Sequence, residues 1–471
     1  MSRQTILAVM LAATACGDDR AAPTTPLASD GTHLRDADGR IALLRGINAR
    51  IGGVFDVDFT DGRTAVEAIP PLAAADCRRM RALGFDLLRL PINWSAIEPA
   101  RGTFDEAYLA RVDAAIGCAA DAGILVLVDL HQDAYSKEIG EDGAPLWAIQ
   151  PPPTELLEGP LTDLGARRTS SQVTAAFTTF FDPTDAAGLQ AAFEDMLAVV
   201  GARWADHPAV IGFELYNEPP VGDAEVTAFH LAAAARMRAV APAKLVLFEP
   251  SALRNFLDTA PLAAAAFPTP DAVYAPHVYT YVFDSDPTRL QDLAPADLEG
   301  SVQHARAEAA AWHTPLVITE YGIGPTSPNA DLWMGLEAQL HDQYLASDAF
   351  WLWKEQSQGA WGVFEPAAGS DGTTSFTERP QVVAWISRVH AARIAGAVVA
   401  NAYDWTTDSL RLEVERGSTG GTAHAIYVPE RAVTSFAVAC DGAAVAAARD
   451  PVTGLVSVAC DGVTTLTTAA Q

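Results

Sequence analysis

Two glutamates, Glu218 and Glu320, each follow a short apolar run of the chain, Val210–Leu215 and Leu316–Thr319 respectively. If both runs are strands that end at one edge, their carboxyl groups can lie about 5 Å apart. At that separation one carboxylate can attack an anomeric carbon, while the other protonates the leaving oxygen and later deprotonates water. The pair therefore indicates hydrolysis of a glycosidic bond with retention, with Glu218 as acid/base and Glu320 as nucleophile.

Further polar, titratable and aromatic residues follow several other apolar runs. Because mechanistic residues of (β/α)₈ barrels lie at the C-terminal ends of strands, we expect these side chains to surround the two glutamates. Either glutamate alone would be more typical of a salt bridge, whereas the pair at two strand ends is a specific signal. The residues expected to bind substrate are Arg89, His131, Asp133, Asn217, His277, Tyr279 and Trp353.

The elements that would position these residues are short apolar runs that alternate with Ala-rich segments of helical periodicity. Eight such repeats predict an α/β fold, a (β/α)₈ TIM barrel; a doubly wound sheet of six or seven strands is the alternative. The expected strands are Ile41–Ile47, Leu87–Leu90, Leu125–Leu130, Val210–Leu215, Leu245–Phe248, Val273–Ala275, Leu316–Thr319 and Ala349–Leu352. The clearest expected helices are Leu72–Leu83, Tyr108–Ala122 and Leu189–Trp204.

Two segments around the barrel strands have their own signals. Asp38-Gly39 lies between two short β-type runs, which predicts a hairpin that closes the barrel floor. The connection between Leu130 and Leu189 is unusually long and contains Pro151-Pro152-Pro153. A long structured loop on the catalytic face is typical of a lid or a binding wall, and a floppy insertion is the alternative.

The composition changes after Arg379-Pro380. A last helix, Val382–Ala391, is expected to complete the barrel region, assigned to residues 31–392. Residues 393–471 are rich in Val, Thr and Ala and predict a small C-terminal β-sandwich, acting as a packing domain or as a sugar-binding module. The expected strands there are Arg411–Glu415, Thr422–Val428, Ser435–Ala439 and Leu455–Ala459.

The N-terminus is typical of an export signal. Arg3 supplies positive charge, Ile6 to Ala13 form a short apolar core, and small residues precede Cys16. Residues 1–16 therefore resemble a bacterial lipoprotein signal that leaves Cys16 lipidated, and residues 17–30 predict a flexible tether. We expect an exported protein, either an outer-surface lipoprotein of a bacterium or a secreted enzyme released by ordinary cleavage.

The remaining four cysteines form two sequence-local pairs, Cys77 with Cys118 and Cys440 with Cys460. Two disulfides are expected in an exported protein, and buried free thiols are the alternative. The net charge of −28 argues against nucleic acid or anionic membrane surfaces as partners, because both would repel the chain. Membrane contact would come through a lipid anchor or the substrate only, and a monomer is expected.

Asn217-Glu218-Pro219, together with Glu320, resembles glycoside hydrolase family 5 over roughly residues 44–364. Within it, the run from Leu130 to Ser136 resembles the endoglycoceramidases, which cut between the glycan and the ceramide of glycosphingolipids. The resemblance implies the following roles: Asn217 on the sugar 2-hydroxyl, Arg89 and Tyr279 orienting ionised Glu320, His277 beside the acid/base, His131 and Asp133 on glycone hydroxyls, and Trp353 stacked under the sugar. The segment after the first strand lacks the lysine of that subgroup, and Arg50 is its candidate substitute.

Three functions compete on this basis. The first is hydrolysis of a glycolipid into an oligosaccharide and ceramide or a related aglycone. The second is an endo-β-glycanase on polysaccharide, of the cellulase or mannanase type, for which an open groove with several tryptophans would be expected. The third is a catalytically silent carbohydrate-binding lipoprotein. No cofactor and no metal are implied, since the mechanism needs only two carboxylates and water.

Overall fold

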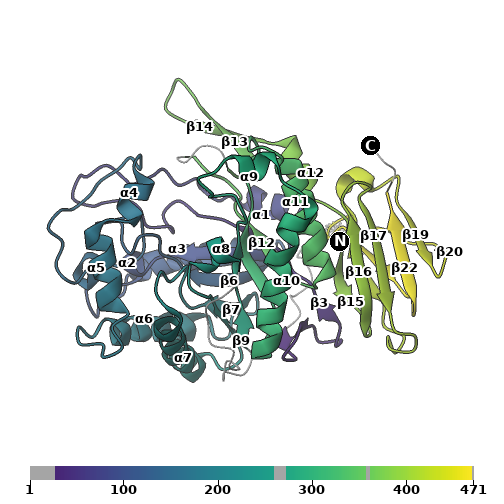
Figure 1. The fold of residues 1–471 in the computed structure, drawn as a ribbon, viewed down its shortest axis with the longest axis horizontal. Coiled ribbons are helices and arrows are strands. Elements are labelled where there is room, and N and C mark those ends of the chain that lie inside the picture. The colour runs from purple at the N-terminus through teal and green to yellow at the C-terminus, as the bar shows by residue number, and fades with distance from the viewer. Residues whose placement is uncertain (1–26, 259–271, 357–360, 469–471) are drawn as a thin grey trace, which may run out of the picture.

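A computed structural model describes residues 27–258, 272–356 and 361–468. Its centre is a parallel sheet with the order β10-β11-β12-β4-β5-β6-β7-β8-β9 (Figure 1). A further parallel bridge between Tyr274 of β9 and Leu316, just before β11, brings the two edges of this sheet together. The sheet therefore closes, and the predicted (β/α)₈ barrel is confirmed. The strands are β4 Arg45–Asn48, β5 Leu87–Ile92, β6 Leu125–Leu130, β7 Val210–Glu214, β8 Leu245–Phe248, β9 Ala272–Tyr274, β10 His277–Val278, β11 Val317–Tyr321 and β12 Ser347–Phe350. The sixth barrel strand is divided into β9 and β10.

Helices cover the outside of the barrel. The predicted helix Leu189–Trp204 is found with those bounds, and the other two begin or end within two residues of their predicted limits. The long connection after β6 contains α4 and α5, so it is a structured wall and not a floppy insertion. The helices are α1 Ala74–Ala82, α2 Trp94–Ile97, α3 Glu106–Asp121, α4 Leu164–Arg168, α5 Ser171–Phe180, α6 Leu189–Trp204, α7 Asp223–Val240, α8 Arg254–Leu257, α9 Thr288–Gln291, α10 Pro295–Trp312, α11 Ala330–Gln343 and α12 Pro380–Ile386.

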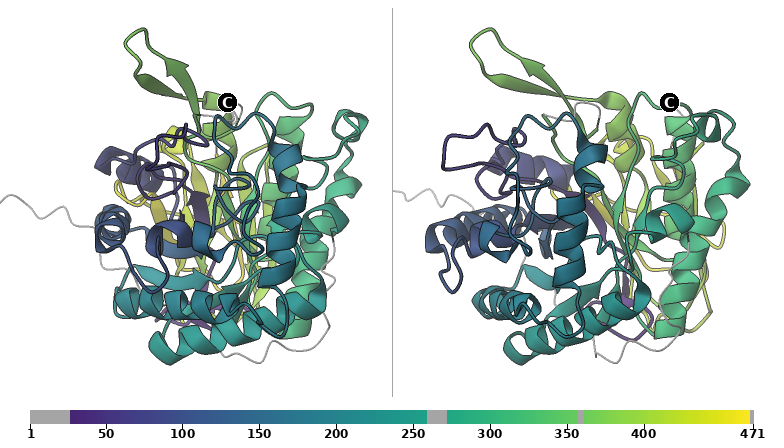
Figure 2. Two further views of the ribbon diagram at one scale, coloured as in Figure 1. Left: turned by 90° about the vertical axis from the view of Figure 1, so that its left-hand side faces the viewer. Right: turned by 60° about the vertical axis from the view of Figure 1, so that its left-hand side comes forward.

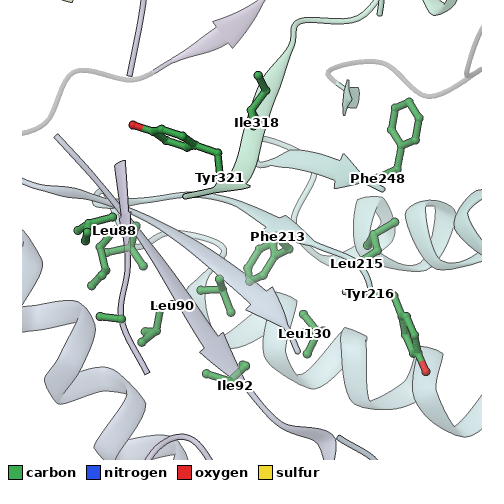
Figure 3. Packing of buried hydrophobic residues seen from close by; sticks show 14 of the residues in the cluster. Leu88, Leu90, Ile92, Leu130, Phe213, Leu215, Tyr216, Phe248, Ile318 and Tyr321 are labelled. Atoms are coloured by element: carbon green, nitrogen blue, oxygen red, sulfur yellow. The ribbon is translucent and has the colours of Figure 1, made fainter. Parts of the chain in front are cut away.

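The barrel strands are buried on both faces, which explains their continuously apolar sequences. In β5, Leu88, Leu90 and Ile92 point into the layer beneath the helices (Figure 3). The intervening residues point into the barrel, where Leu87 belongs to an apolar cluster and Arg89 to a charged one. Each strand therefore stabilises the fold with one face and builds the barrel interior with the other.

The first expected strand, Ile41–Ile47, is in fact two strands. β3 (Ile41–Ala42) pairs with β2 (Leu34–Arg35) as the predicted hairpin, and only β4 enters the barrel. Leu34 and Ala42 pack against the first residues of the barrel strands, so the hairpin closes the floor. β1 (Ala28–Ser29) pairs with β2, so the end of the predicted tether, residues 17–30, is ordered. The export signal and Cys16 lie outside the described residues.

The C-terminal region forms two antiparallel sheets around a shared apolar cluster, which confirms the β-sandwich. One sheet has the order β1-β2-β3-β15-β18-β21, so the N-terminal hairpin belongs to it, and the other has the order β16-β17-β22-β19-β20. Figure 1 shows the sandwich beside the barrel. The strands are β15 His390–Ile394, β16 Val398–Asp404, β17 Ser409–Val414, β18 His424–Tyr427, β19 Ala437–Cys440, β20 Ala443–Val445, β21 Leu455–Val458 and β22 Val463–Thr467.

Three features of this region differ from the predictions. The helix expected over Val382–Ala391 is α12, which ends at Ile386, because the chain enters the sheet at His390. The predicted boundary between residues 392 and 393 therefore falls inside β15. A hairpin of β13 (Phe364–Ala368) and β14 (Thr374–Glu378), which was not predicted, projects from the barrel (Figure 2).

Disulfides join Cys77 to Cys118 and Cys440 to Cys460, as predicted. The first links α1 to α3, and the second links β19 to the segment before β22. Among the described residues, no helix combines the length and hydrophobicity that crossing a membrane requires.

Candidate active site

Glu218 and Glu320 lie at the C-terminal mouth of the barrel. Glu320 is within β11, and its register partner on β10 is His277. Glu218 follows β7, in the left-handed backbone region with φ of 43°. Carboxylate oxygens of the two glutamates and a ring nitrogen of His277 lie within 4.8 Å of one another. This spacing is the one that retaining glycosidases require, because inverting enzymes leave room for a water between the carboxyl groups.

Glu320 is held by two donors. Arg89 Nη1 donates to its Oε1 at 2.6 Å, and the Tyr279 hydroxyl donates to its Oε2 at 2.8 Å. Burial raises the pKa of Glu320, while the positive charges of His277 and Arg89 oppose the rise and the charge of Glu218 adds to it. Both donors favour the ionised carboxylate, the form that a nucleophile needs.

Glu218 has a different set of partners. Its Oε1 accepts from Asn255 Nδ2 at 2.6 Å and lies 2.8 Å from His277 Nδ1. Its backbone N–H donates to Glu249 Oε2 at 3.0 Å, which fixes the left-handed turn. Burial alone would raise the pKa of Glu218, but the hydrogen bond and charge of His277 outweigh burial and lower it.

Glu218, His277 and Glu320 share their protons. Burial lowers the pKa of His277, but the charges of Glu320 and Glu218 raise it above its usual value. The proton between His277 Nδ1 and Glu218 Oε1 can rest on either atom, and on Glu218 it forms the neutral acid that can protonate a leaving group. Protonation of Glu218 also removes a charge that raises the pKa of Glu320, so an acidic Glu218 and an ionised Glu320 favour one another.

Arg89 organises the base of the site. Its side chain is 0% exposed, and besides Glu320 it contacts Glu214 Oε2 at 2.6 Å and Asp129 Oδ2 at 3.0 Å. Its Nη2 also donates to Asn217 Oδ1 at 2.8 Å. A buried guanidinium with several carboxylates around it fixes their positions, because each would otherwise be an uncompensated buried charge.

One pocket, with a volume of about 100 Å³, opens above these groups. Five predicted site residues line it: Asp133, Asn217, Glu218, Tyr279 and Glu320. Arg89 and His277 lie beneath and support the two glutamates from below. His131 also lies below the lining, with Nδ1 2.6 Å from Asp129 Oδ2 and Nε2 3.5 Å from Asp133 Oδ2. His131 is thus placed to orient Asp133, and its predicted contact with a glycone hydroxyl stays a prediction.

Trp353 is not at the pocket, contrary to the expectation. It is 1% exposed, packs edge-on against Phe364 and donates its indole N–H to Asp76. Trp351 lines the pocket instead and stacks on His131 with 5.8 Å between ring centroids. Because β12 ends at Phe350, strand alternation does not extend across these tryptophans.

Several pocket residues had no signal in the sequence. Arg168 reaches the pocket from α4 and contacts Asp133 at 3.0 Å and Glu141 at 3.1 Å, although it lies far along the chain from both. Phe283 and Trp361 come from two different loops. Glu249 could have been found, because it directly follows the expected strand Leu245–Phe248.

Three groups of carboxylates and imidazoles have potential ligand atoms within 4.8 Å of one another. Arg89 already contacts Glu214, Glu249 and Glu320, and Arg168 already contacts Asp133, so these arginines supply the charge that a cation would bring. We therefore assign none of these groups to a metal. The groups are His131 with Asp133 and Asp142, Glu214 with Glu249 and His277, and Glu218 with His277 and Glu320.

Known proteins share this architecture. The model of glycosyl hydrolase family 5, described as cellulase, matches residues 55–357. Endoglycoceramidase I of Rhodococcus hoagii is 30% identical over 388 residues, which cover 77% of this chain and 74% of the relative.

Two solved structures extend the comparison to three dimensions. The structure of an endogalactoceramidase superposes with a TM-score of 0.77 at 26% identity and covers 94% of this chain and 100% of its own. Endo-glycoceramidase II from Rhodococcus sp. shares the fold with a TM-score of 0.75 at 24% identity, covering 93% and 100%. The extent of the family match and the paired glutamates at the barrel mouth lead to one conclusion: the chain belongs to glycosyl hydrolase family 5 and is a glycosidase.

Proposed function

We propose that the protein hydrolyses the β-glycosidic bond between a glycan and a lipid aglycone, with retention of configuration. The observation that carries this proposal is the two-sided character of the active-site pocket. Its lining combines charged groups with the aromatic pair Phe283 and Trp361, and the two glutamates line the same pocket. A substrate with a polar and an apolar half on either side of the scissile bond fits this arrangement.

The polar end provides hydrogen-bonding groups for a sugar. Arg50 donates to Glu355 at 3.0 Å and also pairs with Glu67, and its guanidinium lies 5.7 Å from the ring centroid of Trp351. Asp133 and Arg168, which pair with one another, also line the pocket. Charged, mutually oriented donors and acceptors suit sugar hydroxyls, and the Trp351 ring offers a face to the sugar's C–H groups.

The apolar end starts at the catalytic centre. Tyr279, which donates to Glu320, contacts the ring of Phe283 with 5.0 Å between centroids, and Phe283 stacks on Trp361 at 5.8 Å. Phe283 is 55% exposed, an unusual state for a large aromatic side chain. An alkyl chain lying on these rings would cover them. A polysaccharide that continued past the glutamates would instead meet the charged side chain of Arg168.

The reaction follows from the contacts. Glu320, ionised and oriented by Arg89 and Tyr279, attacks the anomeric carbon and forms a covalent glycosyl ester as the bond to the aglycone oxygen breaks. Glu218 gives its proton to that oxygen, and His277 keeps a proton available to it. Glu218 then takes a proton from water, which attacks the ester and restores Glu320. Asn217, held by Arg89, is positioned for the 2-hydroxyl.

The test is product identification. The protein is incubated with mixed glycosphingolipids in mild detergent and, separately, with cellulose and mannan oligosaccharides, and the products are identified by mass. Release of an intact glycan and ceramide, lost in Glu320→Gln, is the expected result, with the β-anomer formed first by NMR. Cleavage confined to the polysaccharide chains would reject the lipid aglycone, and an initial α-anomer would reject retention.

Export, lipidation of Cys16 and a monomeric state remain proposals as well. Export and lipidation rest on the basic and apolar N-terminal residues and on the small residues before Cys16. The full chain, expressed in a bacterium with a palmitate analogue, should carry the label and fractionate with membranes, and Cys16→Ser should carry none. Labelling that is independent of Cys16 would reject the lipidation of Cys16. Light scattering of the released enzyme measures its mass, and a mass above that of one chain would reject the monomer.

A further inference from the structure

A second, larger cavity of about 620 Å³ lies at the opposite end of the barrel. Gly84 and Asp86, just before β5, and Gly123, just before β6, form its barrel side. Tyr427 of β18 and Arg449 form part of its sandwich side. Because these barrel residues precede the strands, the cavity is separate from the active site, which lies where the same strands end.

The wall between barrel and sandwich is closely packed. The Tyr427 hydroxyl donates to Ala82 O at 2.8 Å, which joins β18 to the end of α1. The Tyr427 ring fits between Gly84 and Gly454, where an added Cβ would lie 2.7 Å and 2.4 Å from ring atoms. The cavity is therefore bounded by residues that the packing holds in place.

Positive charge dominates this cavity, although the chain as a whole has a net charge of −28. Four arginines line it and only two carboxylates, those of Asp86 and Asp450. Asp86 pairs with Arg393 at 3.1 Å, and Arg40 pairs with Asp36 behind the lining. The four arginines are Arg40, Arg81, Arg393 and Arg449.

Two of these arginines, Arg81 and Arg449, form no ion pair with any described residue. Arg81 donates only to Phe85 O at 3.4 Å, a long contact. Arg449 uses Nε for Val428 O at 2.7 Å, and its Nη1 reaches only the backbone oxygen of Asp450 at 3.4 Å. Arg449 also interacts with the Tyr427 side chain, and its Nη2 lies close to Gly454. The remaining N–H groups of the two guanidinium groups are left for a ligand or for water.

The neighbouring carboxylates compensate these charges only in part, because two carboxylates line the cavity against four arginines. Asp86 and Asp450 attract Arg81, and the charge of Arg449 helps to lower the pKa of Asp450. Asp450 Oδ1 accepts from the backbone N–H groups of Val452 and Thr453 and from the Thr453 hydroxyl, so its turn occupies it. Burial lowers the pKa of Arg81, and the charge of Arg393 lowers it further, against the attraction of Asp86. Arg81 and Arg393 therefore repel one another in a partly enclosed site with an excess of arginines over carboxylates, and this excess favours a bound anion.

We propose that this cavity binds a small tetrahedral oxyanion, phosphate or sulfate, free or esterified to a sugar, with Arg81 and Arg449 as its ligands. Planar guanidinium forks match the oxygen geometry of such anions and form charge-assisted hydrogen bonds with them. Arg81 belongs to α1 of the barrel and Arg449 to the sandwich. The anion would therefore bridge the two parts and stabilise their association.

The test is calorimetric titration of the full chain with sodium phosphate, sodium sulfate and glucose 6-phosphate at constant ionic strength. One site per chain is expected, and each of Arg81→Gln and Arg449→Gln should weaken binding by about tenfold or more. Arg416→Gln, which alters an exposed arginine paired with Asp441, is the matched control and should bind as the wild type does. Binding of glucose 6-phosphate as well as phosphate would identify an ester-accepting site.

Activity on an aryl glycoside shows whether each variant is folded, because the active site lies at the other end of the barrel. If the glutamine variants do not fold, Ala448→Glu places a carboxylate at the cavity lining and should abolish phosphate binding by competing for the arginines. The proposal is rejected if the wild type gives no saturable binding. It is also rejected if a folded variant that carries both Arg81→Gln and Arg449→Gln binds phosphate with unchanged affinity. The same result for Ala448→Glu would reject it too.

Discussion

The two ends of the barrel use the same strands for opposite purposes. In β5, Leu87 belongs to the apolar floor and Arg89, two residues later on the same face, lies at the charged mouth. In β11, Val317 is in the floor cluster and Glu320, the proposed nucleophile, lies at the mouth. The barrel interior at the floor is an apolar cluster, whereas the interior at the mouth concentrates buried charges. Stability is thus concentrated at one end and chemistry at the other, as the barrel architecture permits.

The pKa values of two buried histidines show how the surroundings at the mouth and near the floor differ. At the mouth, the carboxylates of Glu320 and Glu218 raise the pKa of His277 and favour its charged form. On the sandwich side of the floor, burial and the charges of Arg45 and Arg388 lower the pKa of His390 to about 3. A catalytic histidine is useful because it can gain and lose a proton, while a structural one is kept neutral.

The largest expected effect separates the roles of the two glutamates at the mouth. Glu320→Gln should lower kcat by about 10³-fold or more for every substrate, because the nucleophile is lost. Glu218→Gln should lower kcat/KM strongly for a lipid aglycone but much less for a dinitrophenyl glycoside, whose leaving group needs no proton. Its kcat should fall on both substrates, because Glu218 is also the base that deprotonates water in the second step. Steady-state kinetics on both substrates measure this, and equal losses in kcat/KM would contradict the acid/base assignment.

A substitution in the apolar floor should change the free energy of unfolding and leave kcat almost unchanged. Leu87 is 0% exposed, so Leu87→Ala leaves a cavity and should lower the free energy of unfolding by about 3 kcal/mol. The value of kcat at a temperature where the variant is folded should remain within about twofold. Urea denaturation and kinetics test this together. Leu146→Ala, at a 45% exposed position, is the control and should change neither by much. A large fall in kcat of Leu87→Ala without a loss of stability would contradict this division between floor and mouth.

A smaller effect is expected from His390. Because its folded pKa of about 3 lies below the usual 6.5, the unfolded chain binds the extra proton between these values. The free energy of unfolding should therefore fall as the pH falls below 6.5, by about 2 kcal/mol from this residue by pH 5. His390→Gln should lose that part of the dependence. Urea midpoints at pH 7.5 and pH 5 provide the measurement, and an unchanged slope in the variant would refute it.

The barrel and the meeting of Glu218 and Glu320 at its mouth could be predicted because their signals are local. Continuously apolar runs followed by Asn217-Glu218-Pro219 or by Glu320 specify both the strand and the strand end. The splitting of the first run was not predictable, since Ile41–Ala42 is as apolar as the barrel strand after it. Its pairing with β15 joins residues far apart in the sequence, and such pairing leaves no local pattern.

The rest of the pocket depended on tertiary packing. Trp351 and Trp353 are two residues apart, and only the path of the chain after β12 decides which one faces the substrate. Arg168 reaches Asp133 because α4 folds back over the mouth. Phe283 and Trp361 meet from separate loops. In each case the residue type alone was compatible with a surface or a core position.

The smallest expected effect concerns the exposed Phe283 ring, which belongs to the apolar part of the mouth. Phe283→Ser removes an exposed ring next to Tyr279 and should raise KM for a lipid-linked substrate by about fivefold, roughly 1 kcal/mol, since half-exposed apolar area is lost. KM for a small aryl glycoside should not change. Val399→Ser, at a 57% exposed position on β16, is the matched control and should leave both values unchanged. If Phe283→Ser raised both KM values equally, the ring would serve the general shape of the pocket. The selective rise is the result that places the lipid on the aromatic side of the catalytic glutamates.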